Sequence, residues 1–124
     1  MRNLIGKTVI AAYTKDGNVF LDTSHGIFKL EPSGDCCASC YIQHVAGSGA
    51  FPGTIAEIRD VDSSTKADDY DNGDVSESWG HLFVTDKGHC TFEMRVDHNG
   101  YYGGSLECYK VEAIPTNSKE LDDF

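Results

Sequence analysis

Positive charge is scarce in this 124-residue sequence, which has ten lysines and arginines against twenty aspartates and glutamates and a net charge of −10. The cations are spread from Arg2 to Lys119, and no two of them are adjacent. Direct binding to phosphate backbones or to anionic lipids requires a basic patch. We therefore expect no direct contact with nucleic acid or with a membrane. The acid excess instead suits a basic protein partner, or it serves only solubility.

Long apolar runs are also missing, since no stretch approaches the roughly 18 apolar residues of a membrane helix. Near the N-terminus, the apolar run stops at Lys7 after three residues. No small-residue cleavage site follows it, as a secretory leader would require. We therefore expect a cytoplasmic protein, in which the five cysteines remain reduced thiols.

Catalytic signatures are absent as well. The sequence has no Ser-His-Asp signature, no glycine-rich phosphate loop and no paired histidines of the metalloprotease type. A thiol nucleophile at Cys36 or Cys37 would lie two helical turns from His44, roughly 11 Å along the axis, which is too far for direct proton transfer. The sequence therefore predicts a binding protein without a cofactor rather than an enzyme.

What the sequence does contain is a series of short apolar runs separated by turn residues, which indicates strands in one domain over residues 1–124. The clearest alternation of apolar and polar side chains runs from Cys90 to Val96, so one face of that strand is expected to be buried. The expected strands are residues 9–14, 19–23 and 27–31 in a first antiparallel meander, residues 54–61, and residues 79–85, 89–96 and 102–111 in a second meander.

One short helix is expected between the two meanders, over residues 36–46. Asp35 can cap it, because its carboxylate can accept hydrogen bonds from the first free amide groups. Apolar side chains such as Ile42 and Val45 would then share one side of the helix. The predicted fold class is α+β, with two antiparallel β-meanders and one short helix packed on the sheet.

Two polar segments are expected to lie outside the packed elements. Residues 62–78 contain six acids and a single cation, Lys66. A polar stretch of this length inside a small domain predicts a mobile acidic loop. Residues 115–124 are short and polar and predict a frayed tail.

Cys37, Cys40 and His44 are the candidate metal ligands. On a helix these side chains would project within about 60° of one another, so they could converge on zinc. Structural zinc sites usually draw paired ligands from two segments, and a second pair is missing here. Buried apolar packing is the alternative role for the cysteines. Residues 68–79 do not match a calcium-binding EF-hand loop, because Tyr70 and Trp79 occupy its third and twelfth positions, and we expect no bound metal.

The candidate partner-binding residues form an acidic group and an aromatic pair. Tyr101 and Tyr102 stand among glycines, which permit close backbone approach, and tyrosines bring large contact area at a low entropic cost. Local packing at a hairpin bulge is the alternative for this pair. The acidic candidates are Asp68, Asp69, Asp71, Asp74 and Glu77.

Several short motifs carry a resemblance to a known family. They are Leu4-Ile5-Gly6-Lys7-Thr8, then Gly34-Asp35-Cys36-Cys37 followed by Tyr41-Ile42 and His44-Val45, and finally Asn99-Gly100-Tyr101-Tyr102-Gly103-Gly104. Together they resemble a small domain family of unknown function, with a Gly-Asp-Cys-Cys motif, that bacteriophage and bacterial genomes carry. In that family serines and a tryptophan usually follow the motif, whereas Cys40 and Tyr41 stand there in this sequence. The resemblance implies no activity and no functional residues.

What the resemblance does imply is a small, acidic, phage-type accessory protein in the host cytoplasm. Such a protein would bind and inhibit a host complex with a basic surface, such as a nucleic-acid-handling defence nuclease, in an anti-CRISPR-like or other anti-defence role. One alternative is a structural or regulatory phage or bacterial protein. The other is a zinc-binding or thiol-active domain, which the missing catalytic set disfavours.

Overall fold

The computed structural model describes residues 1–34, 39–69, 74–98 and 104–124, with side chains for residues 1–34, 39–61, 76–97 and 104–124. Within these ranges, nine antiparallel strands form one sheet in the order β4-β7-β6-β5-β1-β2-β3-β8, and β9 pairs with β1. The strands are β1 (Thr8–Lys15), β2 (Asn18–Thr23), β3 (Gly26–Gly34), β4 (Ser39–Ala46), β5 (Gly53–Asp69), β6 (Asp74–Thr85), β7 (Gly88–His98), β8 (Gly104–Val111) and β9 (Lys119–Glu120).

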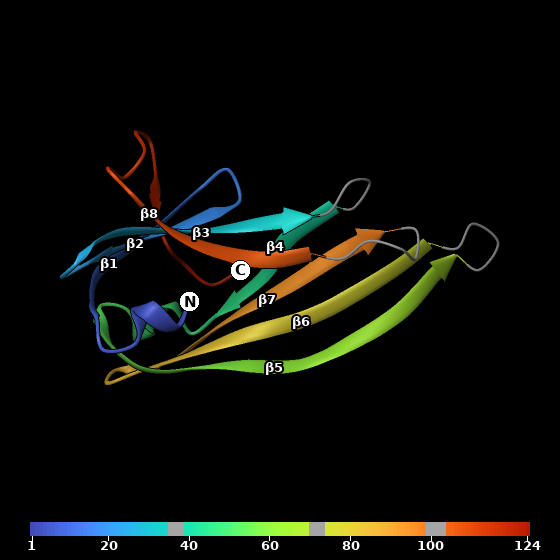
Figure 1. Cartoon of the computed structure of the whole chain (residues 1–124), viewed down its shortest axis with the longest axis horizontal. Coiled ribbons are helices and arrows are strands. Elements are labelled where there is room, and N and C mark those ends of the chain that lie inside the picture. The colour runs from blue at the N-terminus through green and yellow to red at the C-terminus, as the bar shows by residue number, and fades with distance from the viewer. Residues whose placement is uncertain (35–38, 70–73, 99–103) are drawn as a thin grey trace.

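The sheet folds back on itself into two layers (Figure 1). One layer holds β1, β2, β3 and β8, and the other holds β5, β6, β7 and β4. The layers are joined where β1 pairs with β5 at two positions, Thr8 with Thr54 and Val9 with Gly53. Because this junction is so short, the sheet can bend there, and the apolar faces of the two layers meet.

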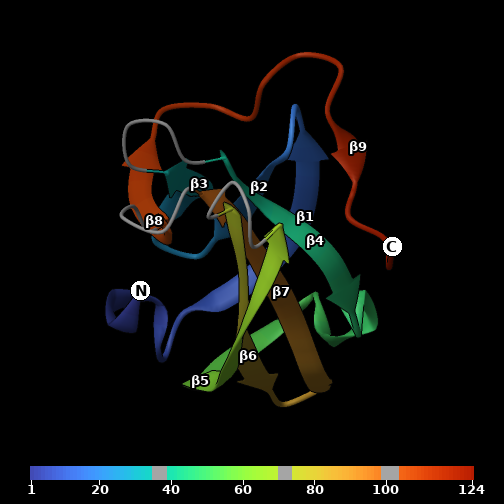
Figure 2. The ribbon, with the colours of Figure 1, turned by 90° about the vertical axis from the view of Figure 1, so that its right-hand side faces the viewer.

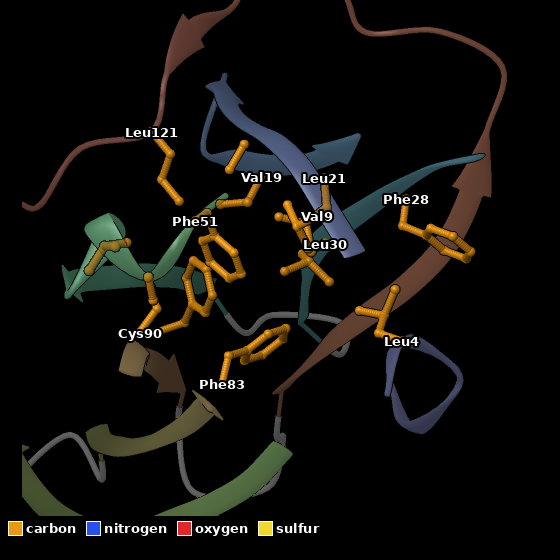
Figure 3. Close-up of a cluster of buried hydrophobic side chains, with 14 of the residues drawn as sticks. Leu4, Val9, Val19, Leu21, Phe28, Leu30, Phe51, Phe83, Cys90 and Leu121 are labelled. Carbon is orange, nitrogen blue, oxygen red and sulfur yellow. The ribbon is translucent and has the colours of Figure 1, made fainter. Parts of the chain in front are cut away.

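Apolar side chains from both layers fill the space between them (Figure 3). The ring of Phe83 on β6 makes edge-to-face contacts with Phe92, at 5.2 Å between ring centroids, and with Phe51, at 6.3 Å. Leu21 and Leu30 contribute from the opposite layer and are fully buried. The core therefore depends on contacts between residues that are far apart in the sequence.

Much of the predicted strand pattern is confirmed. The apolar residues that alternate along β7, from Cys90 to Val96, are all fully buried. The first meander is present, since β2 pairs in antiparallel register with both β1 and β3. In the second meander β6 pairs with β7, but β8 pairs with β3. The other edge of β7 is taken by β4, so β8 crosses to the opposite layer, where Leu106 is buried.

The predicted α+β class is wrong, because residues 39–46 of the expected helix form strand β4. Residues 36–38 of that helix lie outside the described residues. A β-bulge at Gln43 explains the error, since the pairing with β7 shifts between Ile42 and His44. The extra residue reverses the alternation, so Ile42 and Val45 are both buried although they are three positions apart. This spacing is shared by a helix and a bulged strand.

Helix is rare in the part of the chain that the structure describes. It is limited there to two three-residue 3-10 helices, η1 (Arg2–Leu4) and η2 (Ser48–Ala50). Neither of them is long and apolar enough to cross a membrane. The fold of the described chain is therefore all-β.

The acidic stretch at residues 62–78 is not a loop in its described backbone. Strand β5 continues to Asp69, and β6 begins at Asp74. The two strands pair from Ser64 with Ser78 to Asp69 with Asp74, and β6 is held on its other edge by β7. Backbone pairing on both edges of β6 thus extends the sheet through a polar sequence in which no apolar alternation indicates a strand.

The tail is not frayed either. Strand β9 pairs with β1, and Leu121 joins the core with 5% of its surface exposed. Figure 2 shows the chain passing from β8 to β9, which lies beside β1. One buried leucine and a few backbone hydrogen bonds are enough to attach a segment whose other residues are polar or exposed.

Candidate partner-binding end of the sheet

Three pairs of strand ends meet at one end of the molecule, on the right of Figure 1. We call it the distal end, and define it as the end where β3, β5 and β7 stop and β4, β6 and β8 begin. The strand pairing shows that these ends are neighbours, because Asp97 near the end of β7 pairs with both Ser39 and Ser76, near the starts of β4 and β6. In the other layer Gly34 pairs with Gly104.

A contact between the layers joins these strand ends. The thiol of Cys40 on β4 lies 3.8 Å from the carbonyl oxygen of Ser105 on β8, to which it donates a weak hydrogen bond. A Cβ atom at Gly104 would lie 2.7 Å from the Cys40 sulfur, so glycine is needed for this close approach. The distal ends of the two layers therefore lie against each other.

Four of the sequence-predicted partner residues belong to the strands β5 and β6 that reach this end. Asp68, Asp69 and Asp74 belong to the paired ends of β5 and β6, although their side chains lie outside the described ones. Glu77 is a half-buried residue of β6 opposite Val96. Asp71, Tyr101 and Tyr102 lie outside the described residues, directly after β5 in the sequence and directly before β8.

A polar network that the sequence did not reveal lies behind the distal end, on β5 and β6. His81 is buried, and its Nδ1 atom lies 3.1 Å from Oδ1 of Asp60. Trp79 donates its indole N–H to Nε2 of His81 at 3.3 Å. Because an indole can only donate, Nε2 carries the lone pair and Nδ1 carries the proton, which is donated to Asp60.

This network determines the protonation state of His81 and occupies both of its ring nitrogens. Burial lowers the pKa of His81, while the hydrogen bond from its ring to Asp60 opposes that shift. Both ring nitrogens are engaged. The imidazole is therefore a neutral structural link between two strands, and it has no free nitrogen for general base catalysis.

A second network lies on the opposite face of the sheet, on β7 and β4. Arg95 donates from Nε to Oδ1 of Asp97 at 3.0 Å, and the hydroxyl of Tyr41 lies 3.5 Å from Oδ2. Burial raises the pKa of Asp97, but hydrogen bonds from Arg95 and Ser76 outweigh it, so the pKa lies below its usual range. Asp97 thus remains ionised and holds an arginine and a tyrosine near the distal end.

The candidate metal ligands are not arranged as a helix would place them. Cys40 and His44 are on a strand, where four residues span roughly 13 Å. The Cys40 thiol contacts β8, whereas Nδ1 of the exposed His44 lies 3.3 Å from the backbone oxygen of Phe124. Cys37 lies outside the described residues. Among the side chains that are described, no three of His, Cys, Asp and Glu gather into a metal-binding group.

The described thiols are also poor nucleophiles. Burial raises the pKa of Cys40 and Cys108, and it raises the pKa of Cys90 to about 12. Since the thiolate is the reactive form, these three cysteines stay protonated at neutral pH. Their surroundings favour a packing role.

A surface groove of about 510 Å³ lies elsewhere, at the far ends of β3 and β8. It is lined by Gly26, Ile27, Lys110, Val111 and Glu112. The side chain of Lys110 crosses over Gly26, so a Cβ atom there would clash with it. None of the sequence-predicted site residues lines this groove.

The class of protein that these observations define is a small all-β domain built on one antiparallel sheet that folds into two layers. The chain belongs to the family Domain of unknown function (DUF7448), whose model matches residues 2–108. No curated protein and no solved structure matches the chain. The resemblance to a family of unknown function is thereby confirmed, while the Gly-Asp-Cys-Cys motif as its mark and a phage origin stay predictions.

Proposed function

We propose that this protein is a non-enzymatic inhibitor that presents its acidic distal end to a basic surface of a partner protein. The observation that carries the proposal is that the end of β5 and the start of β6 pair with each other and that β6 pairs with the end of β7, the strand that precedes β8 in the chain. The sequence places four aspartates in and between β5 and β6 and two tyrosines in the connection from β7 to β8. Residues far apart in the chain thus belong to one end of the fold.

The acids supply electrostatic steering. Clustered carboxylates that face lysines or arginines raise the association rate and make it strongly dependent on salt. The net charge of −10 adds to this attraction at long range. Charge alone gives little residence time, because exposed ion pairs contribute weakly once formed.

The tyrosines supply the complementary anchoring. Tyrosine is enriched among the residues that dominate binding energies, since it buries much area with few rotatable bonds. Tyr41 and Arg95, which Asp97 holds on the outer face, lie near the same end, and tyrosine and arginine are both enriched at such anchor positions. The partner surface would therefore be basic with apolar or aromatic pockets.

The finer proposal concerns the identity of the partner. A basic groove that normally holds nucleic acid is the surface best matched by an acidic, strand-built edge of this kind. We therefore propose a host complex that handles nucleic acid, such as a defence nuclease, with the protein acting in the cytoplasm as a nucleic-acid mimic. The phage context and the anti-CRISPR-like role come from the sequence resemblance alone.

The test starts with capture from a nuclease-treated host lysate at low and at high salt, followed by binding kinetics with the captured protein. Replacing Asp68, Asp69, Asp71 and Asp74 by Asn should slow association by about ten-fold and flatten its salt dependence. Tyr102→Ala should mainly speed dissociation. Binding that survives both sets of changes, or that is equally strong at both salt concentrations, would contradict the proposal.

A matched control separates the position of the charge from its amount. Asp86, Glu112, Glu120 and Asp122 are exposed and lie away from the distal end. Replacing these four residues by Gln or Asn removes the same total charge as the aspartate variant. If the control variant slows association as much as the distal one does, the net charge and not the distal end accounts for steering.

A further inference from the structure

The C-terminal segment connects the two layers on the side away from the distal ends of β4 and β7. Strand β9 pairs with β1 through Glu120 with Tyr13 and Lys119 with Thr14. The amide of Leu121 then donates to the carbonyl oxygen of Ala12 at 3.0 Å. Up to this point the segment is an added strand on the edge of β1.

The next residues bind to the other layer. Phe124 and Val45 on β4 exchange two backbone hydrogen bonds, each of 3.0 Å. Oδ1 of Asp123 accepts hydrogen bonds from the backbone amides of Gly47 at 3.1 Å and Ser48 at 2.7 Å. These bonds lower the pKa of Asp123, the bond from the Ser48 amide most of all. Residues 119–124 therefore fill the gap between the edges of β1 and β4.

The interactions have the form of peptide recognition. Backbone pairing along two strand edges holds the segment in an extended conformation. Leu121 lies in the core near Val19 and Phe51 (Figure 3), and a carboxylate two residues later is held by paired backbone amides. The site thus selects an apolar side chain, any second residue, and then an acid.

The segment is also weakly attached compared with the rest of the sheet. Leu121 is its one buried side chain, and the other residues from Lys119 to Phe124 are exposed. Segments with few apolar contacts and solvent-exposed backbone hydrogen bonds open locally at a small fraction of the global unfolding free energy.

We propose that the groove between β1 and β4 is a second binding site, which takes an extended peptide of a partner protein with an apolar-x-acid pattern and is occupied by residues 119–124 until such a peptide displaces them. The site is separate from the distal end, because it lies where β4 stops. Its existence does not depend on the function proposed above.

The test uses the full chain and a fluorescein-labelled peptide with the sequence of residues 112–124. The native chain should bind this peptide weakly, because its own segment competes. Leu121→Ala in the chain should strengthen binding at least ten-fold, since removing a buried leucine side chain weakens the competing segment. A peptide with alanine for its leucine and asparagine for its second aspartate should not bind.

Asp122→Asn is the matched chain variant, because Asp122 is exposed between the two recognised residues, and it should bind the peptide as weakly as the native chain does. A folded Leu121→Ala chain that binds no better than the native chain would overturn the proposal. A dimer of the native chain that forms with rising concentration and is lost in Leu121→Ala would show that a second copy is the occupant, which would overturn the assignment to a partner peptide.

Hydrogen exchange of the native chain provides a test that does not depend on the folding of any variant. The amides of Leu121 and Phe124 should exchange at least a hundred-fold faster than those of β6 around Phe83, because the segment opens without global unfolding. If the segment amides exchange as slowly as the amides of β6, the segment leaves only when the whole domain unfolds, and the proposal fails.

Discussion

The two halves of strand β6 (Asp74–Thr85) are held in place by different interactions. From Trp79 to Thr85 its inward side chains enter the core, where Phe83 is fully buried. From Asp74 to Ser78 the sequence is polar, and the strand is held by pairing with β5 on one edge and β7 on the other. The comparison shows that one strand can be anchored by packing at one end while its other end, held by backbone pairing, keeps a polar sequence.

The same contrast applies to the two ends of the molecule. Near η2, the hydroxyl of Thr85 donates to the carbonyl oxygen of Ala50 at 2.8 Å, and Phe51 packs on Phe83. Toward the distal end Val96 is still buried, but polar contacts such as the ion pair of Arg95 with Asp97 appear on the outer face. Stability is therefore expected to come from the core half, and substitutions in the distal half should affect binding more than folding.

Phe83→Ala should have the largest effect on stability. The ring is fully buried and contacts two other aromatic rings, so its loss removes apolar burial and leaves a cavity that costs about 3–5 kcal/mol. Urea denaturation would measure this loss as a lower unfolding free energy, provided that this free energy falls with urea concentration at the same slope in both proteins. The control is Val84→Ala on the outer face, where the side chain is half-buried. Equal losses in the two variants would contradict the division between core and outer face.

The sequence predicted the parts of this fold whose signals are local. The first meander and β7 follow a strict two-residue alternation, so their strands and buried faces could be read directly. Strand β4 could not, because the bulge at Gln43 gives Ile42 and Val45 the spacing of a helix. The pairing of β8 with β3 could not be predicted either, since sequence periodicity does not specify which distant strand is the neighbour.

The candidate site was predictable to the same extent. The acids and tyrosines stood out by composition, and the topology brings their flanking strand ends together. The link from Asp60 through His81 to Trp79 joins residues 21 positions apart on paired strands. Only the register of β5 against β6 reveals it. The spacing of Trp79 and His81, two positions apart on an expected strand, was the one signal that they share a face.

The network of His81 should make the free energy of unfolding depend on pH near neutrality. This dependence would belong to the half of β6 that packs into the core. Because burial lowers the pKa of His81, the unfolded chain binds a proton more readily than the folded one. The stability of the network is therefore present above the unfolded pKa of about 6.5 and decreases as the pH falls toward the folded pKa. Protonation would also place an N–H on Nε2, facing the indole N–H of Trp79.

His81→Gln tests this dependence. The substitution should cost about 1–3 kcal/mol at pH 7.5, because it disturbs hydrogen bonds of a buried network. Comparison of urea denaturation at pH 7.5 and pH 5.5 should show that the native chain loses more stability on acidification than the variant does. His25→Gln is the control, since His25 is exposed in a turn. An equal pH dependence in native and His81→Gln chains would show that His81 is not the titrating group.

Asp97→Asn should have the smallest effect on stability, and it would separate the two polar networks by the pH at which each acts. The carboxylate is partly exposed, with a side-chain accessibility of 40%, so the loss of its ion pair with Arg95 should cost only about 0.2–1 kcal/mol and should shrink at high salt. Since the folded pKa of Asp97 lies below the ordinary value of 3.8, its contribution is complete above that pH and is lost as the pH falls through the folded pKa. Native and Asp97→Asn chains should therefore differ by a constant amount from pH 5 to pH 8 and converge in stronger acid. A difference that instead changes near pH 6 would mean that the two faces of the sheet are coupled through β6, and the two networks would then have to be treated as one.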